Sequence, residues 1–206
     1  MGSLPSPVAT VVWLLDSHDV APDALASYAA WLGPSERARC ARFVRAERRR
    51  QFVLGRALLR VALGRLLQRQ PDTIVLDERP GQAPVLVGEP DAGFSISHSG
   101  RWVACAAGRG MRLGLDIERL DMARDVMALA GQAFGAAEVA VLQALDPQAR
   151  RTAFYRMWCA HEARFKLGCP SAIEYPLETC ELLGVLAVSS PLAQAPDLTP
   201  VRLRGL

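Results

Sequence analysis

The sequence has no apolar stretch long enough to cross a bilayer and no closely spaced pair of cysteines. Membrane-spanning helices need about 20 predominantly apolar residues, and no basic flank precedes the apolar run that begins at Val8, so neither an anchor nor a signal peptide is expected. The cysteines are scattered and odd in number: Cys40, Cys105, Cys159, Cys169 and Cys180. This spacing indicates neither a zinc knuckle nor a secreted disulfide framework. We expect a cytoplasmic protein whose cysteines are small buried apolar residues.

Aromatic residues are also scarce, at 6% of the chain. No interleaved aromatic platform, zinc motif or recognition-helix pattern accompanies the most basic segment, so nucleic-acid binding is not favoured. Net charge is only +3, yet arginines crowd this one segment: Arg37, Arg39, Arg42, Arg45, Arg48, Arg49 and Arg50. Two interpretations of the segment remain open, a local anion site and a solvated helix face.

The chain is rich in hydrophobic residues, which make up 50% of its 206 positions. That is enough for a real core in one domain or in two small ones. Periodicity and breakers predict strands at 8–15, 94–97, 102–107 and 113–118, and helices at 22–31, 46–70, 121–145 and 148–167. The third of these helices is expected to break near Gly135, and the arginines at 56, 60 and 65 to lie on the outer face of the second.

Two distant segments have similar patterns. The segments that begin at Arg48 and Arg150 share an arginine start, an apolar stripe and a glycine stop. This similarity predicts two α+β halves whose interface is a natural cleft.

Three carboxylates fall where a divalent cation could be held. In L-G-L-D-I-E (113–118) apolar residues alternate with Gly114, Asp116 and Glu118, so a strand directs both carboxylates to one side. Glu162 lies in a helix-like segment further along. Magnesium takes one or two carboxylates and completes its shell with water and phosphate oxygens. The alternative is a solvated strand face followed by an ordinary helix pair of Glu162 and Lys166 at i,i+4.

A strand that ends in F-S-I-S-H-S-G (94–100) offers hydroxyl, imidazole and backbone donors to an anion. His98 taken alone could equally be an ordinary turn histidine. With L-G-L-D-I-E and W-C-A-H-E-A-R-F-K (158–166), in this order, the segment resembles the signature motifs of 4'-phosphopantetheinyl transferases. The monomeric type that activates surfactin synthetase is the more similar. Flanking similarity in P-S-E-R-A-R-C-A-R-F (34–43) and G-Q-A-P (81–84) extends the resemblance from Pro34 to Lys166.

The resemblance implies an α+β pseudo-dimer in which each half is a small, mainly antiparallel sheet packed with a long helix. Residues 1–104 would contact coenzyme A, and residues 105–206 would hold magnesium and contact the carrier protein. The implied reaction moves the phosphopantetheine arm of coenzyme A to a serine of an apo acyl or peptidyl carrier protein. It needs Mg²⁺ and releases adenosine 3',5'-bisphosphate. A monomer serving fatty acid, polyketide or nonribosomal peptide biosynthesis is expected.

The resemblance also assigns residues. Asp116, Glu118 and Glu162 would hold the metal; Asp116, Glu162 and Lys166 would be catalytic, with Glu162 or a metal-bound water as the base. The residues that it implies for contact with coenzyme A are Arg39, Gly81, Pro84, Ser97, His98, His161 and Lys166. Arg49 and Arg50 are added as candidates for the 3'-phosphate because they lie near Arg39 in the chain. The segment 124–145 resembles the part of the family that contacts the carrier protein.

The sequence departs from the family pattern at two cations. His161 stands where the third motif commonly has lysine, and Gly81-Gln82-Ala83-Pro84 lacks the lysine of G-K-P. Both changes predict weaker binding of coenzyme A. Compared with the family's usual closing strands, the sequence after Lys166 is short and rich in proline, which predicts an abbreviated sheet in the second half. A catalytically quiet module that binds coenzyme A or a carrier protein is the alternative function, although the intact carboxylates favour the enzyme. A magnesium-dependent phosphohydrolase is disfavoured, since no additional nucleophile or second metal cluster is found.

Overall fold

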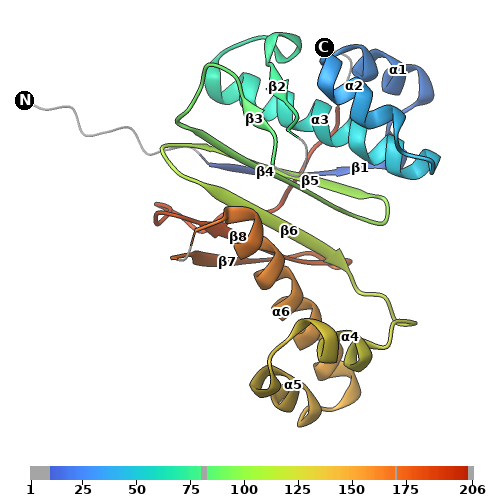
Figure 1. Cartoon of the computed structure of the whole chain (residues 1–206), viewed down its shortest axis with the longest axis vertical. Coiled ribbons are helices and arrows are strands. Elements are labelled where there is room, and N and C mark those ends of the chain that lie inside the picture. Colours follow the sequence, from blue (N-terminus) through green and yellow to red (C-terminus); the bar gives the residue numbers. More distant parts are fainter. Residues whose placement is uncertain (1–9, 80–82, 170, 204–206) are drawn as a thin grey trace, which may run out of the picture.

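The protein is described by a computed structural model that covers residues 10–79, 83–169 and 171–203 (Figure 1). Its strands are β1 (Val11–Asp16), β2 (Leu76–Asp77), β3 (Val85–Leu86), β4 (Ala92–Ser99), β5 (Trp102–Arg109), β6 (Leu113–Arg119), β7 (Ile173–Glu178), β8 (Leu182–Val188) and β9 (Thr199–Pro200). Its helices are α1 (Pro22–Ala30), α2 (Pro34–Ala41), α3 (Ala46–Leu67), α4 (Val126–Ala133), α5 (Ala136–Gln143) and α6 (Pro147–Leu167), with short 3-10 turns at Ser17–Asp19 and Pro71–Thr73. None of the helices in these ranges is both long and apolar enough to cross a membrane.

Two main sheets organise the fold. The first has the order β4-β5-β1-β9, with β4, β5 and β1 antiparallel and β9 parallel to β1. The second has the order β6-β8-β7 and is antiparallel throughout. A separate two-stranded pair joins β2 to β3. The predicted α+β class with mainly antiparallel sheets is therefore confirmed.

The first sheet is buried on both faces because its strands alternate two apolar sets. Trp13, Leu15 and Val103 pack with α3 on one face. The intervening residues, such as Leu14 and Ala104, pack against the second sheet. On the far side of the second sheet lies α6, whose buried residues pack on β8. The layers therefore run from α3 through the two sheets to α6 (Figure 1).

Local sequence signals place the long helices well. Asp146 caps α6 by accepting the N–H groups of Gln148 and Ala149, and Gly168 ends it at φ 61°. Helix α3 begins at Ala46 as predicted but ends at Leu67, where Gln68 takes a left-handed conformation at φ 56°. The predicted break near Gly135 separates α4 from α5. Residues 121–125 are not helical, however. The Asp125 side chain accepts the N–H groups of Met127 and Ala128 as the N-cap, so α4 begins only at Val126.

The division of the chain into halves at residue 104 stays a prediction. That position lies inside β5, and the chain passes from the first sheet to the second between Arg109 and Leu113. The proline-rich end then returns to the first sheet as β9, beside β1. The second sheet accordingly keeps three strands, of which β8 is wholly buried. Each sheet carries one long helix, and a pseudo-dimer relation between the halves stays a prediction.

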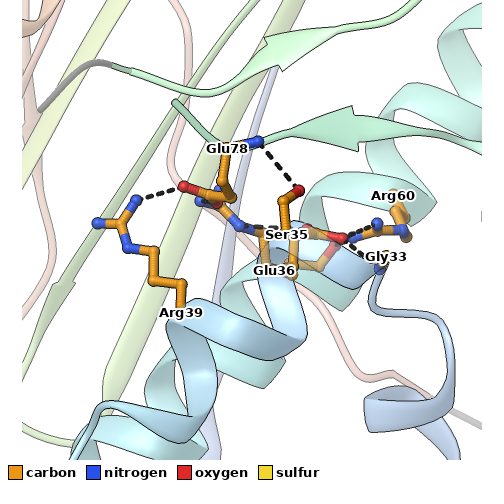
Figure 2. A network of polar contacts seen from close by, with 7 residues as sticks. Gly33, Ser35, Glu36, Arg39, Arg60 and Glu78 are labelled. Carbon is orange, nitrogen blue, oxygen red and sulfur yellow. Dashed lines mark hydrogen bonds and ion pairs between the residues drawn. The ribbon is translucent and has the colours of Figure 1, made fainter. Parts of the chain in front are cut away.

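A buried network of ion pairs holds α2 against α3 (Figure 2). Glu36 is fully buried and accepts from Arg60, which is 1% exposed. Arg56 pairs with Glu36 and Glu78, and Glu78 also accepts from Arg39. Burial lowers the pKa of Arg56, and the two carboxylates oppose this shift. The expected outer-face position of Arg56 and Arg60 is therefore wrong: their charges are buried because acidic partners are supplied from elsewhere in the chain.

Candidate functional site

Asp116 is the centre of a buried polar contact between the two halves. It lies on β6 and is 6% exposed. Its Oδ1 accepts hydrogen bonds from the Lys166 ammonium at 2.7 Å and the Ser97 hydroxyl at 2.9 Å. Lys166 also donates to the carbonyl of Leu115 at 2.9 Å. Three predicted site residues from three separate motifs therefore meet at one carboxylate.

Gly114 makes this meeting possible. A Cβ atom at this position would lie 1.9 Å from the carbonyl oxygen of Ala163 and 2.6 Å from the amide nitrogen of Leu167. Both atoms belong to the backbone of α6, so no side-chain rotation could relieve the contact. The missing side chain lets α6 lie directly on β6 and brings Lys166 within reach of Asp116.

Glu118 lies two residues further along β6 and is half-buried. Its Oε2 accepts from the hydroxyl of Ser99 at 2.5 Å. Burial raises the pKa of Glu118, and the Asp116 carboxylate raises it further, while the Ser99 hydrogen bond acts in the opposite direction. Because Asp116 and Glu118 occupy alternate positions of β6, their side chains lie on one face of the strand.

The described residues fit a magnesium ion that is held by few protein ligands. Oδ2 of Asp116 is buried and has no hydrogen-bond partner among the described residues, so one carboxylate oxygen remains for a cation. Glu162 is half-buried on α6, one turn before Lys166. Within the described ranges, no three potential metal-ligating side chains are gathered into one group. Two carboxylates still suit Mg²⁺, which completes its shell with water and substrate phosphate.

A cleft of ≈ 840 Å³ lies between the halves beside this cluster. Its wall is basic: the acidic residue that lines it in the described structure is Glu89, and the basic ones are Arg39, Arg48, Arg56, Arg112 and Lys166. Arg39, Arg56 and Lys166 are paired with carboxylates. The predicted residues Pro84 and His98 line the same cleft. A space of this size and charge suits a polyanionic ligand.

Other predicted residues lie elsewhere. Arg49 donates to the carbonyl of Phe43 at 3.0 Å, and Arg50 donates to the carbonyls of Ser17 and Val20. Neither arginine lines the cleft.

His161 and Ser97 also face partners other than the cleft. The Nε2 atom of His161 lies 2.7 Å from Glu138 Oε1 on α5, and its ring lies 5.0 Å from that of Phe134. The hydroxyl of Ser97 is turned towards Asp116. Gly81 lies outside the described residues.

Arg48 is a cleft residue that sequence reasoning did not single out. Its Nη1 atom lies 2.7 Å from Nε2 of His98 and 3.0 Å from Oε1 of Gln51. Arg48, Phe52 and Gly55 line the cleft together at helical spacings of four and three residues. That spacing was the available signal, since it separates Arg48 from its neighbours Arg49 and Arg50 in the arginine run.

His98 is expected to be neutral at pH 7. Burial, followed by the Arg48 guanidinium, lowers its pKa from 6.5 to about 4. The pKa of His98 is lower in the folded state than in the unfolded state, so protonation favours unfolding. The stability that the neutral imidazole contributes is therefore fully present above pH 6.5 and is lost as the pH falls towards 4. An NMR titration of the imidazole should have its midpoint near pH 4, and Arg48→Ala should raise that midpoint. A midpoint at or above 6.5 would contradict the burial seen here.

Comparison with known proteins finds a match in each half of the chain. Residues 19–110 match the family described as "4'-phosphopantetheinyl transferase, N-terminal", and residues 112–183 match "4'-phosphopantetheinyl transferase superfamily". 4'-Phosphopantetheinyl transferase HetI of Nostoc sp. is 33% identical over 145 residues, which cover 69% of this chain and 61% of the relative. 4'-Phosphopantetheinyl transferase Sfp of Bacillus subtilis is 31% identical over 139 residues, which cover 68% of this chain and 61% of the relative.

A third relative is covered more fully. 4'-Phosphopantetheinyl transferase AcpT of Salmonella typhi is 30% identical over 142 residues, which cover 69% of this chain and 70% of the relative. The matched part of this chain spans only 61% of the length of HetI and of Sfp.

Proposed function

We propose that this chain, which belongs to the 4'-phosphopantetheinyl transferase superfamily, transfers the phosphopantetheine arm of coenzyme A to a carrier protein. The acceptor is a serine hydroxyl of an apo acyl or peptidyl carrier protein, and adenosine 3',5'-bisphosphate leaves. The observation that carries the proposal is the contact of Asp116 with Lys166 and Ser97 beside a basic cleft. The chain is proposed to act as a cytoplasmic monomer in fatty acid, polyketide or nonribosomal peptide biosynthesis.

The cleft provides the charge that coenzyme A needs. Coenzyme A carries a pyrophosphate and a 3'-phosphate, and guanidinium groups bind phosphate through charge-assisted hydrogen bonds. Arg48 and Arg112 line the cleft and form no ion pair among the described residues. These two arginines are proposed to compensate for the lysines replaced by His161 and missing from residues 81–84.

The reacting end of coenzyme A is proposed to lie next to β6. Asp116 and Glu118 would hold Mg²⁺ there, with Glu162 as a third ligand or as the base that accepts the serine proton. Magnesium supplies charge neutralisation at a pyrophosphate. Lys166 reaches the same point from α6, so its ammonium group could donate to phosphate oxygens. The neutral His98 would offer an N–H donor to phosphate without adding charge.

The carrier protein is proposed to dock on the second half. A mainly apolar pocket of ≈ 520 Å³ lies there. It is lined by residues of the α4 region, among them Leu129, and by Phe154 and Trp158 of α6. Arg124 lies at the same pocket and could meet an acidic side chain of the carrier. Asp125 lines the pocket beside Arg124, so the apolar lining is the feature that fits the apolar face of an amphipathic carrier helix, and Arg124 is the group that would meet an acidic residue of that helix.

The test is direct modification of carrier proteins. Wild-type protein with Mg²⁺ and coenzyme A is incubated with a panel of apo acyl and peptidyl carriers, and each carrier is weighed by mass spectrometry. An increase equal to one phosphopantetheine group is expected, and a carrier whose acceptor serine is replaced by alanine should show none. Tight binding of coenzyme A without modification of any carrier would favour the quiet binding module instead.

Arg48→Ala is expected to raise KM for coenzyme A about tenfold or more, with kcat little changed, because one charge-assisted hydrogen bond is worth about 1.5–3 kcal/mol. Arg49→Ala is the matched control: it removes the adjacent guanidinium, which here contacts the Phe43 carbonyl rather than the cleft. Steady-state kinetics on both variants separates the two arginines. Equal effects on KM would contradict the placement of Arg48 as the cleft residue.

A further inference from the structure

A row of serine hydroxyls joins the two sheets. Strand β6 pairs with β8 along one edge only. On its other edge the N–H groups of Leu115, Ile117 and Arg119 donate to serine hydroxyls of β4. The acceptors are Ser95 at 2.9 Å, Ser97 at 3.1 Å and Ser99 at 3.0 Å. These three residues, here called the serine row, occupy alternate positions and so lie on one face of β4.

The serine row replaces a neighbouring strand. An N–H group at an unpaired strand edge inside a protein is costly unless another acceptor satisfies it. The serine row supplies that acceptor three times in succession, and the buried environment of Ser95 and Ser97 makes the need strong. The first half of the chain therefore completes the hydrogen bonding of the second.

Each serine hydroxyl still has a proton to donate. Ser97 directs it to Asp116 Oδ1 at 2.9 Å, and Ser99 directs it to Glu118 Oε2 at 2.5 Å. Opposite Ser95 the corresponding position on β6 is Gly114, which has no side chain to accept. All three serines therefore accept from an N–H group of β6. Ser97 and Ser99 also donate to a carboxylate, whereas Ser95 has no carboxylate opposite it.

We propose that Ser97 and Ser99 are positioning residues that fix the carboxylates of Asp116 and Glu118 for the cation and substrate. This inference rests on the proposed function and adds to it a division of labour. The second half carries the carboxylates, and β4 of the first half sets their orientation. A carboxylate held by a directed hydrogen bond loses rotational freedom before the ligand arrives, which strengthens the site.

The experiment compares Ser99→Ala with Ser95→Ala. Both variants leave one N–H of β6 without its acceptor, so both should unfold at lower urea concentration than wild type. Only Ser99→Ala also frees a carboxylate. Binding of Mn²⁺, a paramagnetic probe for the magnesium site, is measured by electron paramagnetic resonance in the presence of coenzyme A. At saturating coenzyme A, Ser99→Ala should weaken Mn²⁺ binding about 10–100-fold. Ser95 lines the cleft, but its hydroxyl accepts from the Leu115 N–H rather than holding a carboxylate, so under the same conditions Ser95→Ala should leave Mn²⁺ affinity within about twofold of wild type.

Ser99→Thr retains a hydroxyl at the same atom and should restore Mn²⁺ affinity. If the serine row is purely structural, the two alanine variants should change Mn²⁺ affinity equally or not at all. Either result, with a wild type that transfers phosphopantetheine, overturns the inference and leaves the proposed function standing. A wild type that neither binds Mn²⁺ nor modifies any carrier overturns the proposed function together with the inference. The two failures are therefore distinguishable.

Discussion

Asp116→Ala is expected to lower kcat/KM for phosphopantetheine transfer at least about a thousandfold, since a bound metal supplies several kcal/mol of charge stabilisation and each 1.4 kcal/mol is a factor of ten. The substitution removes the buried oxygen that has no partner in the described structure. It also leaves the Lys166 ammonium without its carboxylate. Initial rates across a range of Mg²⁺ concentrations measure the effect. High Mg²⁺ should recover little of the loss.

Two controls accompany this variant. Asp77→Ala removes one exposed carboxylate from β2, so it changes the net charge equally and should keep nearly full activity. Circular dichroism of Asp116→Ala should show an intact fold, because the apolar cores do not depend on this side chain. A folded Asp116→Ala protein with near-normal transfer would refute the assignment of Asp116 to the active site.

Gly114→Ala is expected to destabilise the protein by about 3 kcal/mol, at the upper end of the cost of overpacking a core, and to abolish transfer. One methyl group here would overlap two backbone atoms of α6. The helix must then move away from β6, and Lys166 and Glu162 move with it. Urea unfolding gives the stability and the carrier assay gives the activity.

Gly131→Ala is the control for Gly114→Ala. Gly131 lies in α4, where a Cβ atom would meet nothing within 4 Å. Alanine at such a helical position should be neutral or should stabilise by about 0.5–1 kcal/mol. If the two alanine variants were equally stable, the close approach of α6 to β6 would be refuted.

The parts of the fold set by local sequence were predictable. Alternation in 113–118 placed β6 and directed both carboxylates from it, and Gly168 marked the end of α6. The helix predicted from 121 was too long because an Asx cap at Asp125 starts α4 instead. Periodicity alone does not distinguish a capping loop from a first helical turn.

The parts that depend on distant partners were not predictable. Arg60 looks like a solvent-facing helix residue, but Glu36 arrives from another helix and pairs with it in the core. The serine row likewise accepts hydrogen bonds from the edge of β6, and β5 lies between β4 and β6 in the chain. Such contacts depend on which surfaces meet in three dimensions, and one sequence does not state this.

The pairing of β9 with β1 joins distant parts of the chain, because Trp13 is the register partner of Thr199. Contacts between residues so far apart in the chain cost loop-closure entropy and form late in folding. During synthesis one edge of β1 therefore stays unpaired, and the first sheet stays incomplete, until nearly all of the described chain has left the ribosome. We expect a slow final folding phase in which this edge closes.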